Sequence, residues 1–193
     1  SAVASNSLAA IPLFILMAQF VLQSGALTSL FDSARVLIGR TRGGTAYAAV
    51  GAGAVFAAVS GSSTAAAATL AHTSTDKMIE QGYDRKLSAG VVASAGTLAA
   101  MIPPSILLIF YAITAETPVG DTLIAGLIPG LLVAVALAIC VAIIIRVRGG
   151  SAPKGEPSSW AEKFRSLKGL LPILLLFVVV VGLVFLGVTT ATE

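Results

Sequence analysis

Residues 43–75 read GGTAYAAVGAGAVFAAVSGSSTAAAATLAHTST, and this stretch decides how the rest of the chain is arranged. Two arms composed mainly of small residues flank a polar turn, Ser60-Gly61-Ser62-Ser63. Small residues let helices pack closely inside a bundle, and glycine gives the turn its backbone freedom. The pattern predicts a helical hairpin that is covered by other parts of the protein, because its arms carry little apolar surface of their own.

The chain as a whole has the composition of a membrane protein. Of its 193 residues, 56% are hydrophobic and 11% are charged, and the mean hydropathy is +0.96. A soluble globular chain carries about 25% charged residues, so this chain cannot cover itself with a water-facing surface. Three uncharged runs, 8–31, 126–145 and 169–192, reach the roughly 20 residues that a helix needs to cross the hydrocarbon core. An all-α integral membrane protein is predicted.

The positive charges predict how the chain is oriented. All 12 lysines and arginines fall into three clusters, at 35–42, 77–86 and 146–168. Short loops rich in Lys and Arg stay in the cytoplasm. If residues 43–75 crossed the membrane once, the charges would divide three against nine, whereas a segment that enters and returns leaves all 12 in the cytoplasm. We therefore expect residues 43–75 to form a re-entrant hairpin.

A second interruption lies in the next apolar passage. Leu87 to Ile102 reads as a helix that Pro103-Pro104-Ser105 breaks before Ile106 to Ala115 resumes. Two prolines remove two backbone donors and disfavour helix just before them, so carbonyls around residues 98–101 lose their usual partners. Such carbonyls suit a hard cation such as Na⁺, while the N-terminus of the following helix favours an anion. Alone, the prolines indicate a structural kink; beside a Gly/Ser hairpin they indicate a binding site at membrane depth.

The remaining segments divide at charged and Gly/Pro-rich stretches. We expect a transmembrane helix with an amphipathic arm at 1–42, a part at 43–118 that contains the hairpin (43–75) and the broken helix (87–115), a transmembrane helix at 119–148, a cytoplasmic linker with an amphipathic helix at 149–168, and a transmembrane helix at 169–193. The amphipathic stretches 28–39 and 158–169 repeat apolar residues at helical spacing, with Trp160 as an interface anchor. They are either levers between moving parts or plain anchors.

Several side chains that could have a chemical role have simpler structural interpretations. Cys140 lies in an apolar run and is expected to act as a small apolar residue. His72, the only histidine, is expected to be structural or interfacial rather than a proton carrier. The charges from Asp76 to Arg85 are read as a water-exposed loop.

Other functional classes are disfavoured. The basic residues form no water-facing patch of the kind that binds nucleic acid. The sequence contains no Gly-x-x-x-x-Gly-Lys-Ser/Thr phosphate loop for an ATP-driven pump. It also contains no His, Cys and carboxylate cluster for enzyme chemistry. We therefore expect neither an enzyme nor a cofactor.

Together, these stretches resemble the large membrane subunit of tripartite ATP-independent periplasmic (TRAP) transporters. The matching pieces, in the family's order, are 8–14, the Ser60–Ser63 tip, 82–84, 96–98, 102–105, 125–130 and 189–193. The resemblance implies two inverted repeats and an elevator mechanism, in which a transport domain with two hairpins and two broken helices slides against a scaffold. It places residues 43–118 in the transport domain and residues 1–42 in the scaffold. With one tip and one Pro-Pro break, this chain is expected to be the first repeat, half of an elevator-type transporter, with the second repeat beyond Glu193.

The resemblance also implies where ligands bind. Sodium is expected mainly at backbone oxygens of Ser60, Ser63, Ala99, Ile102 and Pro104. A substrate carboxylate is expected at the hydroxyls of Ser62, Ser63 and Thr64. The residues Gly61, Gly96, Thr97 and Pro103 are expected to shape the tip and the break. The family often has Gly at the position of Ala99, and Ala keeps the carbonyl.

The implied function is sodium symport of a small organic acid across the bacterial inner membrane, by a multi-pass subunit in contact with lipid. A periplasmic substrate-binding protein and a small membrane subunit are the implied partners. One alternative is a sodium-coupled elevator for di- or tricarboxylates that works without a binding protein. The other is a structural membrane scaffold, which offers no reason for a Gly/Ser hairpin and a broken helix at membrane depth.

Overall fold

The computed structural model describes residues 23–38, 41–148 and 152–153, with a few isolated residues at 12–20 and 166–182. Within these residues the chain is helical and has no strand, so the predicted all-α class is confirmed there. One described helix, α8 (Val119–Val147), is long and apolar enough to cross a membrane. Its 29 residues extend for about 44 Å. The predicted segments 149–168 and 169–193 lie almost entirely outside the described residues.

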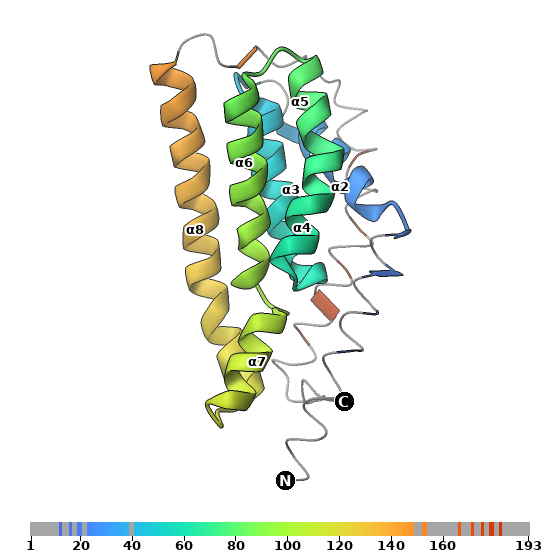
Figure 1. Cartoon of the computed structure of the whole chain (residues 1–193), viewed down its shortest axis with the longest axis vertical. Helices are drawn as coiled ribbons and strands as arrows, with labels where there is room; N and C mark the ends of the chain where they lie inside the picture. Colours follow the sequence, from blue (N-terminus) through green and yellow to red (C-terminus); the bar gives the residue numbers. More distant parts are fainter. Residues whose placement is uncertain are drawn as a thin grey trace.

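The small-residue stretch forms a helical hairpin. The first arm is α3 (Gly44–Ser60), and the second consists of α4 (Ser63–Leu70), a π-helical turn η1 (Ala71–Thr75) and α5 (Asp76–Glu80). Both arms lie along one half of α8, with α5 back at the end where α3 starts (Figure 1).

The return arm is longer than predicted. Asp76 to Glu80 is helical, so the expectation of a loop from residue 76 to residue 85 is wrong for its first half. Met78 explains the difference, because its side chain is 0% exposed and holds this last turn against the core. Asp76 and Glu80 are exposed on the same turn, and this density of charges suggested a loop.

Helix α6 (Arg85–Thr97) packs against both arms of the hairpin. It begins at Asp84, whose side chain accepts the N–H groups of Lys86 and Leu87, both at 3.0 Å. A Cβ placed on Gly96 would lie 2.5 Å from the Cβ of Ala67 on α4. The predicted close packing of small residues therefore depends on glycine at this helix–helix contact.

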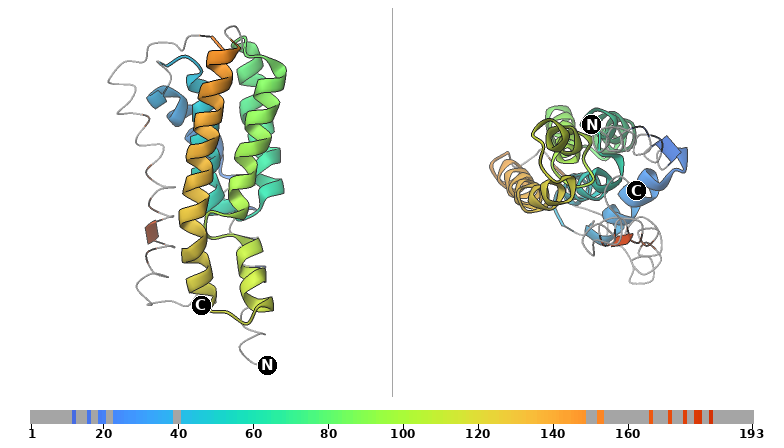
Figure 2. Two further views of the ribbon diagram at one scale, coloured as in Figure 1. Left: turned by 90° about the vertical axis from the view of Figure 1, so that its left-hand side faces the viewer. Right: turned by 90° about the horizontal axis from the view of Figure 1, so that it is seen from below.

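The passage after α6 is interrupted. A short 3₁₀ turn, η2 (Leu98–Ala100), is followed by Pro103 and Pro104, and helix resumes as α7 (Ile106–Thr114). Helices α6 and α7 lie one after the other along α8, with the interruption between them (Figure 2). α8 contacts α3, α6, α7 and η2, so it packs against the other helices along most of its length.

The amphipathic arm is α2 (Ala26–Ile38), which packs against α3 and buries Leu30 and Phe31, both 0% exposed. A turn at Ser24 and Gly25 (φ 72°) precedes it, so the uncharged run 8–31 is not one continuous helix. An ion pair of 2.7 Å between Lys77 and Asp32 joins α5 to α2.

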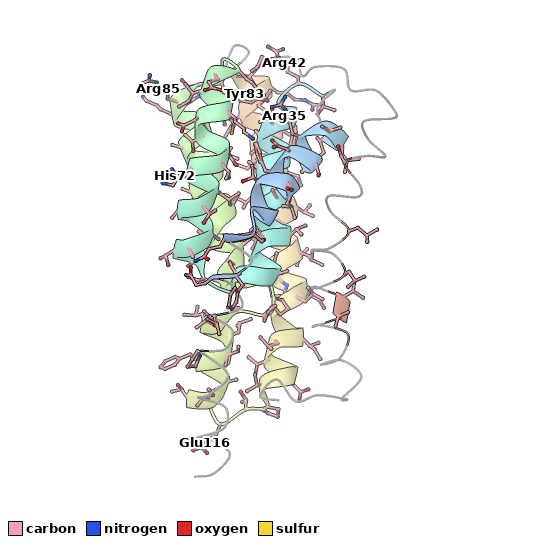
Figure 3. All side chains as sticks on the ribbon, turned by 90° about the vertical axis from the view of Figure 1, so that its right-hand side faces the viewer. Arg35, Arg42, His72, Tyr83, Arg85 and Glu116 are labelled. Atoms are coloured by element: carbon pink, nitrogen blue, oxygen red, sulfur yellow. The ribbon has the colours of Figure 1, made fainter. Side chains whose placement is uncertain are left out.

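The charges divide between the two ends of the bundle. Arg35, Arg42 and Arg85 lie at one end and Glu116 at the other (Figure 3). α8 finishes at the basic end, where Arg146 lies in its last turn (Figure 1). The described parts of the three basic clusters are therefore on one side of the molecule.

Candidate functional site

The tip of the hairpin is a tight polar turn. α3 ends at Gly61, whose left-handed conformation (φ 59°) lets its N–H bond the carbonyl of Ala57 at 3.2 Å. Ser62 then begins α4, and its Oγ accepts the N–H of Ala65 at 3.5 Å. Ser60 is 2% exposed, and its Oγ donates to the Ser62 carbonyl at 3.5 Å. The Gly and Ser residues are therefore needed locally to end one helix and begin the next.

The break leaves one carbonyl without its helical donor. In a continuous helix, the N–H of residue 103 would bond the carbonyl of residue 99, and that of residue 104 the carbonyl of residue 100. Proline supplies neither donor. Ser105 replaces one of them, because its Oγ donates to the Ala100 carbonyl at 2.8 Å. The Ala99 carbonyl receives no hydrogen bond from any residue that the structure describes.

The 3₁₀ turn supplies hydrogen-bond donors for another carbonyl of the break. Leu98 O accepts the N–H of Met101 at 3.0 Å and that of Ile102 at 2.9 Å. Of the carbonyls at 98–101 that were predicted to lose their partners, those of Leu98 and Ala100 therefore have new donors. The set of carbonyls without a donor is therefore smaller than predicted. Ala99 is the position at which a proline directly removes the helical hydrogen-bond donor.

The tip and the break lie against each other. Ile106, the first residue of α7, donates its N–H to the Gly61 carbonyl at 3.1 Å. A Cβ on Gly61 would stand only 2.7 Å from the Pro104 carbonyl oxygen, so the two backbones can come this close only with glycine at position 61. α3 and α4 both contact η2 as well. Two segments that the sequence identified separately thus meet at one place, partway along α8 (Figure 2).

The residues predicted to hold sodium fall on both sides of this contact. Ser60 and Ser63 are at the tip, and Ala99, Ile102 and Pro104 are at the break. Ser63 is half-buried and the other four are buried. The structure shows that these residues lie on the two segments that meet at this contact. Their binding of sodium stays a prediction.

The residues predicted to bind substrate are more open. Ser62 and Ser63 are half-buried and Thr64 is exposed. The hydroxyl oxygens of Ser62 and Thr64 are 3.2 Å apart. Because these residues are the cap and first turn of α4, unpaired N–H groups of that helix lie nearby. Hydroxyl and N–H donors of this kind suit a carboxylate.

The residues predicted to shape the site behave differently from one another. Gly61 makes the contact between tip and break, and Gly96 makes the contact between α6 and α4. Pro103 is buried in the break. Thr97 is exposed, and its Oγ1 donates to the Ser94 carbonyl of its own helix at 2.7 Å. Among the described residues, no hydrogen bond joins the Thr97 side chain to the tip.

Two glycines of α8 support the break and had no structural role in the sequence analysis. A Cβ on Gly126 would stand 2.8 Å from the Met101 carbonyl oxygen, and one on Gly130 would stand 2.8 Å from Cγ1 of Ile102. The backbone of α8 therefore touches the break directly. Their Gly-x-x-x-Gly spacing is a signal for close helix packing, and the spacing was available in the sequence.

The oxygens offered by the site are neutral. Among the described residues, no three His, Cys, Asp or Glu side chains are grouped as metal ligands would be. His72 lies on η1, between the tip and the basic end, and its side chain is exposed (Figure 3). Carbonyl and hydroxyl oxygens are hard ligands, which suit alkali and alkaline-earth cations better than transition metals.

A long apolar helix, a small-residue hairpin and an interrupted helix that meet around neutral oxygens are the features that the sequence analysis expected of a membrane transport protein. The chain is a member of the family described as "Tripartite ATP-independent periplasmic transporter, DctM component", which it matches over residues 1–193. The family predicted from the sequence is confirmed.

Curated relatives carry the corresponding names. The chain is 40% identical over 187 residues to the C4-dicarboxylate TRAP transporter large permease protein DctM of Pseudomonas aeruginosa. It is 33% identical to the ectoine TRAP transporter large permease protein TeaC of Halomonas elongata and 31% identical to the sialic acid TRAP transporter large permease protein SiaM of Vibrio cholerae. Each match covers 97% of this chain and 43% of the relative. The chain thus spans less than half the length of these relatives.

Proposed function

We propose that this chain is part of the transport subunit of a sodium-driven importer for a small organic acid. Family membership supports a transporter component. The observation that carries the proposal is the contact between the hairpin tip and the broken helix, where Ile106 donates to Gly61. A polar turn and a proline break, buried against each other in an apolar protein, suit an ion and a polar solute rather than a structural element.

In this proposal, the hairpin enters the inner membrane from the cytoplasm and returns there. α3 has 17 residues and extends for about 26 Å, and α8 extends for about 44 Å. A hairpin of that length, starting at the basic end, reaches the middle of the bilayer. The lack of exposed large hydrophobic side chains among the described side chains of 44–106 supports shielding from lipid, since α7 and α8 expose many.

Sodium binds between the tip and the break. The ligands are oxygens of Ser60 and Ser63 on one side and of Ala99, Ile102 and Pro104 on the other. The Ala99 carbonyl is suited to this role because Pro103 leaves it without a helical donor. The substrate carboxylate binds at Ser62, Ser63 and Thr64, where the positive end of the α4 dipole adds to the hydroxyl donors. Ion and substrate are then neighbours, which couples their binding.

Transport follows the elevator mechanism, in which the hairpin and the broken helix move together against a scaffold. Contacts of α6 with α3 and α4, and of η2 with α3, support movement of the hairpin and the broken helix as one body. A second repeat completes the site, and a small membrane subunit supports the scaffold. A periplasmic substrate-binding protein delivers the organic acid. The relatives named for dicarboxylate, ectoine and sialic acid leave the particular substrate to experiment.

Uptake into proteoliposomes tests the proposal. The complete membrane subunits that contain this chain are reconstituted, and accumulation of labelled organic acids is measured with the sodium gradient and the binding protein each present or absent. We expect accumulation only when both are present. Replacing Pro103 and Pro104 with alanine restores two N–H donors to the break and should abolish sodium-driven uptake while circular dichroism shows unchanged helix content.

The other outcomes are equally informative. Uptake that is indifferent to the binding protein would indicate an elevator that works alone. Uptake that is indifferent to sodium, in wild type and in the double proline variant alike, would remove the cation site from the proposal. No uptake of any acid by a correctly inserted complex would favour a structural subunit.

A further inference from the structure

The hydroxyl group of Ser105 joins the two sides of the break. Ser105 directly follows the two prolines and is 0% exposed. Its Oγ donates to the Ala100 carbonyl of η2 at 2.8 Å and accepts the N–H of Leu108, in the first turn of α7, at 3.4 Å. One buried side chain therefore connects the two helical segments that the prolines separate.

This hydroxyl makes two neighbouring carbonyls unequal. Pro103 and Pro104 take the helical donors away from the carbonyls of Ala99 and Ala100 alike. Ser105 supplies a new donor to Ala100, whereas no described residue supplies one to Ala99. A carbonyl oxygen that accepts a short hydrogen bond is held in place, and one of its lone pairs is occupied. Without Ser105, the break would offer two adjacent donor-free carbonyls instead of one.

Ser105 acts through this carbonyl and not as a ligand itself. Its proton is directed at Ala100, one lone pair of its oxygen is directed at Leu108, and the residue has no exposed surface. A cation that replaced either hydrogen bond would undo the cap of α7 or release η2. Ser105 is therefore a positioning residue for the oxygens of the break.

We propose that Ser105 fixes the set of oxygens that the cation meets at the break and so makes the site selective for Na⁺ over the larger K⁺. The proposal rests on the proposed sodium site between the tip and the break. Selectivity between cations depends on the number, the field strength and the rigidity of the oxygen ligands. A second free carbonyl, in a break whose two halves are no longer joined, admits a larger ion with a larger coordination shell.

Thermal unfolding of the complete membrane subunits that contain this chain tests the proposal without transport. The purified complex is titrated with NaCl or with KCl, and choline chloride keeps the ionic strength constant. A cation that binds the folded protein raises the melting temperature, so each titration gives a half-saturating concentration. The quantity compared between variants is the ratio of the K⁺ value to the Na⁺ value.

Ser88 provides a matched control for Ser105→Ala. Ser88 is also 0% exposed, and its Oγ donates to a backbone carbonyl, that of Asp84, at 3.0 Å. Ser88→Ala therefore removes the same buried hydroxyl group and the same kind of hydrogen bond, but at the start of α6 and not at the break.

We expect Ser105→Ala to lower the K⁺ to Na⁺ ratio about fivefold, the effect of one hydrogen bond on an equilibrium constant. Ser88→Ala should lower the melting temperature in choline chloride but leave the ratio within about twofold of wild type. An unchanged ratio in Ser105→Ala, or equal changes in both variants, would overturn the proposal, because Ser105 would then only stabilise the fold. A wild-type complex that neither cation stabilises would instead overturn the proposed sodium site.

Two further variants separate the hydroxyl from the volume of the side chain. Ser105→Thr keeps the hydroxyl and should restore the wild-type ratio, whereas Ser105→Cys offers a weaker donor and should give a ratio between those of wild type and Ser105→Ala. If Ser105→Ala does not fold, Ser105→Cys decides the question. A wild-type ratio in a folded Ser105→Cys complex would then contradict the assignment of selectivity to this hydrogen bond.

Discussion

Replacing Gly61 with alanine adds one methyl group at the contact between the tip and the break. Gly61 has φ 59°, and an alanine in this left-handed region costs about 1–2 kcal/mol. The methyl carbon would also stand 2.7 Å from the Pro104 carbonyl oxygen. Carbon–oxygen contacts of this kind are found at about 3.3–3.6 Å, so the tip must move away from the break. Overpacking of this kind costs typically about 1–3 kcal/mol.

Gly82 provides a matched control for the backbone strain. It has φ 87°, and a Cβ there would meet no atom within 4 Å. Gly82→Ala therefore carries the conformational cost without the clash. The difference between the two variants isolates the steric effect on the closed site. A cost of about 1–3 kcal/mol corresponds to a change of about 5- to 150-fold in an equilibrium constant.

The assay is the sodium dependence of substrate uptake by the complete complex in proteoliposomes. We expect the sodium concentration that gives half-maximal uptake to rise about 5- to 150-fold in Gly61→Ala. In Gly82→Ala it should stay within about twofold of wild type, a change well below 1 kcal/mol. Equal behaviour of the two variants, or an unchanged sodium dependence in Gly61→Ala, would refute the reasoning that tip and break hold the cation together.

Three further predictions concern packing, charge and the single histidine. Gly96→Ala should destabilise the complex by about 1–3 kcal/mol because its Cβ would lie 2.5 Å from a side chain on α4; Gly90→Ala, with open space around it, should leave the melting temperature unchanged or higher. Lys77→Ala should cost at most about 1 kcal/mol in thermal unfolding, since the ion pair with Asp32 is partly exposed. A larger loss would show that the pair is structurally important. His72→Gln should leave the rate and pH dependence of uptake within about twofold, and a lost pH dependence would make His72 a proton carrier.

The tip and the break were predictable because each acts on its own backbone. Gly61 ends α3 through its φ angle, and Ser62 caps α4 with its side chain. Pro103 removes the donor that residue 99 would have had, whatever surrounds it. These effects reach four residues at most, so the sequence around them is enough to identify them. The family assignment follows the same local patterns and is confirmed over the whole chain.

The end of the hairpin was not predictable in the same way. The charges around Met78 suggested a loop, but the helix continues to Glu80 because Met78 is buried. Similarly, Gly126 and Gly130 are spaced for close packing, yet nothing in their neighbourhood indicates that the break is their partner. A contact between two helices depends on which surface of the second helix packs against the first, and that surface is distant in sequence.

The sequence by itself therefore determined the helical class, the family and the positions of the polar turn and of the proline break. Hydropathy, charge placement and proline chemistry are properties of single residues and their immediate neighbours, so they need no knowledge of packing. Only the tertiary structure decided that the tip touches the break and that α8 supports the break through two glycines. Each of these depends on distances between elements that are far apart in the chain, which are set by the packing of the whole bundle.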